Sequence, residues 1–152
     1  MSDLNKIDGV YEVPLPEGTF YLASRVTNRV KSKFQSWLSG RVRRRVFDAR
    51  KQGVLDPAEF KESLDNLDAG DAAGRFDWGS VCWAETIQGT LGIVEALSLL
   101  AEDCKRNGAK VSRQRVCELM VDDATAEMMA TAWGKILDAS PNFRMPVLEE
   151  TG

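Results

Sequence analysis

The hydrophobic positions of this 152-residue chain change their period after the first two dozen residues. Two short runs near the N-terminus, Val10–Val13 and Thr19–Leu22, are rich in β-branched and aromatic residues, which is typical of strands. Prolines and a glycine separate them over residues 14–18 and indicate a turn. The pattern predicts a β-hairpin. Because two strands alone are marginally stable in water, we expect the hairpin to pack on the helices that follow.

From residue 24 to residue 51 the apolar residues recur at steps of four. They are Val26, Val30, Phe34, Leu38, Val42 and Val46. Each step overshoots one turn of an α-helix by about 40°, so the stripe spirals around about 200° of a straight helix. A single flat core cannot cover such a stripe. We therefore expect a helix that is either wrapped by neighbours or bent or broken, most readily at Ser39–Gly40.

Helix-start signals place the next elements. Asp56 and Pro57 are suited to the N-cap and first position of a helix that we expect to end at about Leu67. A small-residue loop is predicted over residues 68–74. The next stretch, residues 78–106, is apolar over most of its girth and predicts one buried central helix that Asn107–Gly108 would end.

Two further helices are expected near the C-terminus. Ser112 is placed to cap a short one, and Asp122 or Asp123 to cap the last, which Ser140–Pro141 would end. The fold class is thus α+β and mainly α, with an N-terminal β-hairpin followed by about five helices packed as one bundle-like domain. This single domain would span residues 9–140, between a flexible N-terminus (1–8) and an extended C-terminal tail (141–152).

Composition narrows the function classes. The chain has no histidine, which removes the most common general base and zinc ligand. Its adjacent carboxylates point about 100° apart on a helix and do not converge, and its acidic residues lack the spacing of a calcium loop. We therefore expect a protein that is not an enzyme, with no catalytic residue, no metal site and no cofactor.

Several smaller signals concern location and packing. The most apolar stretch, residues 81–101, carries two carboxylates and is predicted to be a buried helix of a soluble protein, not a membrane span. The N-terminus resembles no secretion signal, so we expect a cytoplasmic protein. The three cysteines are expected to be reduced and to pack in the core. Gly89 and Gly92 are expected to permit a close helix–helix contact.

Charge is distributed very unevenly. Residues 25–51 hold ten of the twenty basic residues and one acid, a net charge of +9, whereas the rest of the chain has a net charge of −12. The densest positive charge is at Arg41, Arg43, Arg44 and Arg45, our candidate partner-binding residues. Such a separation of charge is informative about partners and not about the fold.

Three interpretations of this basic segment remain open. It could bind the phosphates of a nucleic acid, but no aromatic residues interleave with the arginines and the whole chain is acidic. It could be neutralised within the chain, because residues 53–77 carry seven acids and Glu59, Glu62 and Asp65 share one helix face. It could also bind an acidic surface on a protein partner.

The order of these pieces resembles tail assembly chaperones of long-tailed bacteriophages. The resemblance begins at Leu15-Pro16-Glu17-Gly18, an "LP-x-G" turn followed by hydrophobic residues. It continues through the apolar segment GTLGIVEALSLLAEDCKRNGAKVS, then RQRVCELMVDD and ATAEMMATAWGKIL. It covers about residues 9–140 and is one of layout.

The resemblance implies a small protein of the host cytoplasm that binds a long helical tail protein, chiefly the tape measure protein, during tail assembly. It also implies that the chain can self-associate. The same features would suit a phage inhibitor of host defence or a structural adaptor in a virion. A nucleic-acid-binding module that uses residues 25–51 is the alternative from another class.

Overall fold

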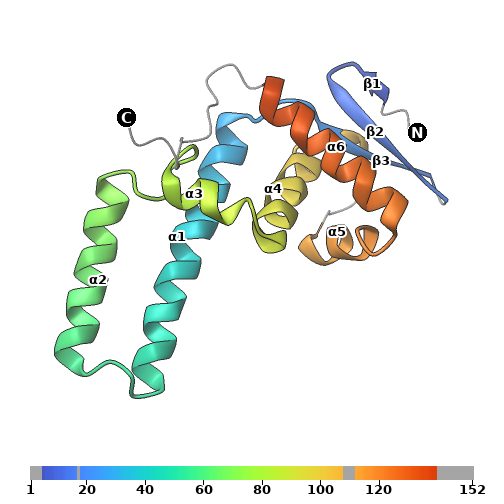
Figure 1. The fold of residues 1–152 in the computed structure, drawn as a ribbon. Coiled ribbons are helices and arrows are strands. Elements are labelled where there is room, and N and C mark those ends of the chain that lie inside the picture. Colours follow the sequence, from blue (N-terminus) through green and yellow to red (C-terminus); the bar gives the residue numbers. More distant parts are fainter. Residues whose placement is uncertain (1–4, 17, 108–111, 140–152) are drawn as a thin grey trace, which may run out of the picture. The chain divides into compact units, whose positions relative to one another are not determined.

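The computed structural model describes residues 5–16, 18–107 and 112–139 (Figure 1). It confirms an α+β chain that is mainly helical, with a small antiparallel sheet at the N-terminus. The strands are β1 (Asn5–Ile7), β2 (Val10–Leu15) and β3 (Gly18–Ala23). The helices are α1 (Asn28–Lys51), α2 (Pro57–Ala72), α3 (Val81–Thr86), α4 (Thr90–Glu102), the 3₁₀ turn η1 (Lys105–Asn107), α5 (Arg113–Leu119) and α6 (Asp123–Ala139).

The described residues group into two compact units. One contains the sheet, the start of α1 up to Val30, and the chain from Thr86 to the end of α6. The other contains residues 31–85, which hold most of α1, all of α2 and nearly all of α3. The expected single domain over residues 9–140 stays a prediction.

In the first unit the predicted hairpin is present and has gained a third strand. β2 and β3 pair antiparallel, with Tyr11 opposite Leu22 and Val13 opposite Phe20, and these four side chains are buried. β1 pairs with the other edge of β2, within the segment that was expected to be flexible. In this unit α4 packs against β3, α6 against β2 and α5 against α4, so the sheet buries one face under helices (Figure 1).

The single central helix expected over residues 78–106 is wrong, because the chain forms α3 and α4 with a turn between them. Gly89 is the extended N-cap of α4, and its N–H donates to the Thr86 carbonyl at 3.1 Å. At Gly92 a Cβ atom would lie 2.1 Å from the same carbonyl oxygen. The close contact expected at these glycines is thus present at Gly92, against the backbone carbonyl of Thr86.

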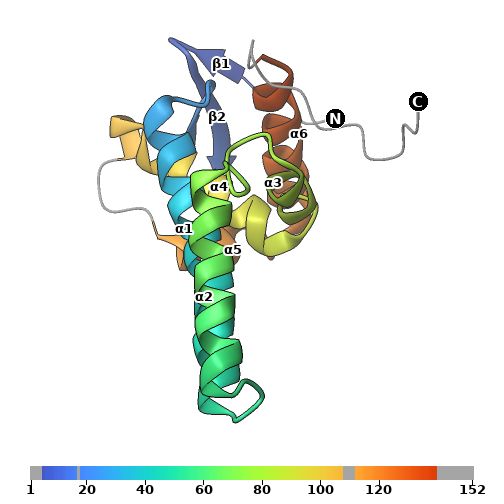
Figure 2. The ribbon, with the colours of Figure 1, turned by 90° about the vertical axis from the view of Figure 1, so that its left-hand side faces the viewer.

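In the second unit α1 is one continuous helix, so the break that Ser39–Gly40 made possible does not occur. α1 and α2 run antiparallel, side by side, as a helical hairpin (Figures 1 and 2). The apolar stripe of α1 is fully buried at Phe34 and Leu38 but only half-buried at Val42 and Val46. The far half of the helix therefore keeps much of its surface accessible.

The prediction that this second helix ends near Leu67 is wrong, because α2 continues to Ala72 through the segment expected to be a loop. Its start is as predicted. Asp56 accepts from the Glu59 N–H at 2.8 Å, and the Glu59 carboxylate accepts from the Asp56 N–H at 3.0 Å, which forms a capping box. Asp68 and Asp71, in this last part of α2, pair with Arg43 of α1.

Of the remaining local expectations, some are confirmed and one is wrong. Ser112 caps α5, and Asp122 caps α6 by accepting from the N–H and hydroxyl of Thr125. Cys104 is buried and Cys82 half-buried, but the core placement expected of Cys117 is wrong, because this thiol is exposed. The expectations for Gly108, Ser140–Pro141 and the tail 141–152 fall outside the described residues. No helix in the described ranges is long and apolar enough to cross a membrane.

Candidate protein-binding surface

The four arginines singled out by the sequence lie on the far half of α1, but the structure separates them into different environments. Arg43 faces α2. Its guanidinium pairs with Asp68 at 2.8 Å and with Asp71 at 3.3 Å, and the Ser39 hydroxyl donates to the other oxygen of Asp71 at 2.8 Å. The hydrogen bond with Asp68 is the main cause that raises the pKa of Arg43 above its ordinary value. Arg43 is thus neutralised within the hairpin.

The acidic segment therefore folds back on the basic helix, as the interpretation of neutralisation within the chain requires. The carboxylates that make the contact are not the three that share one helix face. Glu59, Glu62 and Asp65 were expected to cover the arginines. Instead they are exposed, and Glu59 serves the capping box. The covering carboxylates are Asp68 and Asp71, which belong to the stretch expected to be a loop. Sequence reasoning counted them among the seven acids of residues 53–77 but did not place them on α2, because it ended that helix too early.

Arg41 and its neighbours lie on other faces of α1. Arg41 is half-buried and stacks on the Trp37 ring, with its guanidinium carbon 5.0 Å from the ring centroid. Arg44 and Arg45 are exposed, and among residues 5–16, 18–107 and 112–139 neither forms an ion pair or hydrogen bond. Lys51, in the last turn, is exposed too.

We call four basic residues of α1 that do not pair with α2 the basic ridge: Arg41, Arg44, Arg45 and Lys51. Arg41 and Arg45 are each two residues from Arg43, which places them about 160° around the helix axis from it and hence away from α2. Asp48 is the one acid on this side. The ridge therefore has a net charge of +3 that the hairpin does not neutralise.

Apolar side chains lie exposed beside the ridge, near the closed end of the hairpin. Phe47 is 44% exposed and meets the Phe60 ring edge-on, with centroids 5.2 Å apart. Val54, in the connection between the helices, is 68% exposed. Phe47 lies off the step-of-four stripe and Val54 lies outside both helices, so the hydrophobic pattern did not single them out.

A cleft of about 430 Å³ lies in the half of the same hairpin that is farther from the connection between α1 and α2. It is lined by small and polar residues of α1, including Ser32, Ser36 and Gly40, and by Phe76 and Asp77. Two other lining residues, Arg43 and Asp71, already pair with each other. The cleft therefore offers little charge for a ligand.

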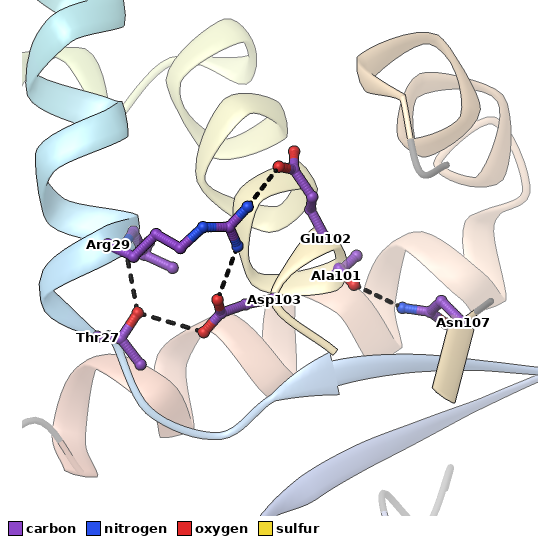
Figure 3. Close-up of polar contacts among 7 residues, drawn as sticks. Thr27, Arg29, Ala101, Glu102, Asp103 and Asn107 are labelled. Carbon is purple, nitrogen blue, oxygen red and sulfur yellow. Dashed lines mark hydrogen bonds and ion pairs between the residues drawn. The ribbon is translucent and has the colours of Figure 1, made fainter. Parts of the chain in front are cut away.

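Charged residues of the first unit are used to hold its elements together. Thr27 caps α1 by accepting from the Val30 N–H at 3.3 Å, and its hydroxyl donates to Asp103 at 3.2 Å. Arg29 pairs with Asp103 at 2.9 Å and with Glu102 at 3.1 Å (Figure 3). These contacts tie the first turn of α1 to the end of α4. This cluster is therefore an anchor.

Two further observations concern metal ions and similarity to known proteins. In the described part of the chain, no group of three or more His, Cys, Asp or Glu side chains is arranged to hold a metal ion. Compared with known proteins, the chain matches no family model, no curated protein and no solved structure.

Proposed function

We propose that this chain is a non-enzymatic protein-binding module that docks an acidic surface of a protein client on the basic ridge of α1. The observation that carries the proposal is the division among the arginines. α2 supplies carboxylates to Arg43 and leaves Arg44 and Arg45 exposed and unpaired within the described residues. Unpaired charge at a protein surface steers an oppositely charged partner and adds to specificity.

The apolar residues beside the ridge favour a protein client. Phe47 and Val54 offer anchors of the kind that carry binding energy in protein interfaces, where aromatic and Arg residues are enriched. A nucleic acid would gain less from them. It would also meet Asp48 on the ridge, which repels phosphates.

The layout resemblance suggests which client this is. In a tail assembly chaperone of a long-tailed bacteriophage, the client is the tape measure protein, a long helical chain that must be kept soluble until the tail is built. We propose that role for this chain, acting in the cytoplasm of the host cell. An inhibitor of host defence or a virion adaptor would use the ridge to bind a different protein.

The test is capture of the client by the tagged chain in infected cells. We expect the tape measure protein to be recovered and identified by mass spectrometry. Recovery of host defence proteins alone would contradict the chaperone proposal and support the inhibitor. A tape measure gene immediately downstream of this gene is the matching genomic observation.

Charge-reversal variants test the ridge itself. Arg44→Glu with Arg45→Glu should weaken capture about tenfold or more, because both charges then repel an acidic client. Lys61→Glu with Lys135→Glu makes the same change in net charge at exposed positions off the ridge and should leave capture intact. If both variants lose capture equally, the effect comes from the net charge of the chain and not from the ridge. Tight, salt-dependent binding of mixed-sequence DNA that the ridge variant loses would favour the nucleic-acid module.

A further inference from the structure

One face of α1 repeats every seven residues. In alternating steps of four and three it runs through Lys33, Trp37, Gly40, Arg44, Phe47 and Lys51, which we call the seam. Trp37 is half-buried and the other five are exposed. The average step is about 3.5 residues, the period at which two helices stay in contact along their length. At 1.5 Å per residue the seam is about 27 Å long.

The seam borders the contact between α1 and α2. Arg43, which pairs with carboxylates of α2, marks the side of α1 that faces that helix. Arg44 lies about 100° and Gly40 about 60° around the helix axis from Arg43. Phe47, about 40° away, still meets the Phe60 ring of α2. The seam therefore lies beside α2, on a side of α1 that stays exposed.

Gly40, in the middle of the seam, leaves room for a second helix to approach closely. A Cβ atom there would meet no other atom within 4 Å, so no contact of this fold requires a glycine. Glycine also weakens the interior of a helix relative to alanine. Gly40 lines the cleft of about 430 Å³ together with Ser36, one turn before it. A large apolar side chain that faces Gly40 has room to enter this cleft.

The charge of the seam restricts what docks there. Lys33, Arg44 and Lys51 are basic, and none of the seam residues is acidic. Within the described ranges, Arg44 and Lys51 form no ion pair. These two cations are seven residues apart, and so are Gly40 and Phe47. A helix that repeats one acid and one large apolar residue every seven positions matches both pairs at once.

We propose that the client docks as an acidic amphipathic helix with heptad spacing, which lies along the seam of α1 and inserts an apolar side chain at Gly40. The inference rests on the proposed function, because it names the form of the client segment that binds Arg44 and Lys51. An acidic loop would meet the same two cations, but it would gain nothing from the seven-residue period or from Gly40.

The experiment is a titration of the full chain into a fluorescent peptide at low ionic strength, followed by anisotropy. The probe is a synthetic helix of about three heptads, with Leu at the first and Glu at the fourth position of each and Ala and Gln elsewhere. We expect it to bind at least about tenfold more tightly than a peptide of the same composition in shuffled order. Equal binding of the two peptides, or no binding of the heptad peptide, would overturn the proposal.

Gly40→Gln separates close approach from charge. Glutamine is the better helix former and meets nothing within 4 Å at its Cβ, so the circular dichroism spectrum should be unchanged. Binding of the heptad peptide should fall about tenfold, because the longer side chain holds the two helices apart. Gly134→Gln, at an equally open glycine of α6, is the matched control and should bind like the wild type. Unchanged binding by Gly40→Gln would rule out a close contact at this position.

Arg44→Glu with Lys51→Glu tests the charges of the seam. This variant should lose the acidic peptide and bind the version in which Lys replaces Glu. If the acidic peptide still binds as tightly, it docks elsewhere on the chain and the proposal is wrong.

These measurements contain no client protein, so their failure is distinguishable from failure of the proposed function. If the heptad and shuffled peptides bind equally while the tape measure protein is still captured, the client uses the ridge but not as a helix along the seam. If the peptides behave as expected and no tape measure protein is captured, the seam stands and the proposed client is wrong.

Discussion

Gly92 is the position at which one added methyl group should be most damaging. A Cβ atom there would lie 2.1 Å from the Thr86 carbonyl oxygen and 2.6 Å from its carbon. These atoms belong to the backbone, so no side chain can rotate away to make room. Since nonbonded Cβ contacts under 3.0 Å essentially never occur, the end of α3 would have to move by about 1 Å.

The magnitude follows from comparison with ordinary core substitutions. Extra methylene groups in a packed core cost about 1–3 kcal/mol when side chains can adjust. Here the backbone must adjust, so we expect Gly92→Ala to lower the free energy of unfolding by about 3 kcal/mol or more. That is a loss of about a hundredfold in the folding constant, since each 1.4 kcal/mol is a factor of ten.

Gly134 in α6 provides the matched control. Nothing lies within 4 Å of a Cβ atom at Gly134, and alanine is the better helix former. Gly134→Ala should therefore raise the free energy of unfolding by about 0.5–1 kcal/mol. The same chemical change thus has opposite signs at two helical positions of the same unit.

Urea denaturation followed by circular dichroism measures both changes. Hydrogen exchange of the α4 amides reports specifically on the unit that contains Gly92, even if the two units unfold separately. If Gly92→Ala is as stable as the wild type, or if Gly134→Ala is equally damaging, the close contact of Gly92 with the Thr86 carbonyl does not limit the stability of this unit.

Three further predictions concern the first unit. Arg113→Met leaves the buried Glu95 carboxylate without its guanidinium partner, and should cost about 1–3 kcal/mol in chemical denaturation, most of it recovered by adding Glu95→Gln. Hydrogen bonds from the N–H and hydroxyl of Thr125 lower the pKa of Asp122, so its contribution is complete above about pH 4 and is lost as the pH falls through the lowered folded-state pKa. Asp122→Ala should therefore destabilise the chain in thermal melts near neutral pH, and the difference should narrow in acid. Asn107→Ala removes a side chain that bonds to the outer edge of β3, and should speed aggregation on mild warming, measured by light scattering.

Each of these has a clear contrary result. No recovery on adding Glu95→Gln would mean that the buried charge is not the cause of the loss. A difference between wild type and Asp122→Ala that is constant from neutral pH into acid would contradict the capping role of the carboxylate. Unchanged light scattering of Asn107→Ala would show that the edge of β3 is protected in another way.

The candidate surface was only partly predictable. The unequal charge of residues 25–51 is readable in the sequence, and it pointed to Arg41, Arg43, Arg44 and Arg45 as a group. Which of them remain available depends on where α2 places its carboxylates. That depends on the length of α2 and on its rotation about its own axis, and neither follows from the local spacing of residues.

Asn107 shows the same limit in the first unit. In the sequence it appeared to be part of a helix stop. In the structure its side-chain amide accepts from the Tyr21 N–H at 2.9 Å and donates to the Tyr21 carbonyl and the Ala101 carbonyl, both at 2.8 Å (Figure 3 shows the bond to Ala101). Tyr21 is 86 positions away along the chain. No local pattern indicates such a bond.

The sequence by itself determined the features that depend on residues close to one another along the chain. The caps at Asp56 and Ser112, the β2–β3 hairpin and the mainly helical class all follow from residue type and short spacing, and the cap of α6 was narrowed to Asp122 or Asp123. The tertiary structure alone decided where α2 ends, that the central helix is two helices, and which arginines are covered. These features depend on ion pairs and close backbone contacts between separate elements, whose energies appear only when the chain has folded.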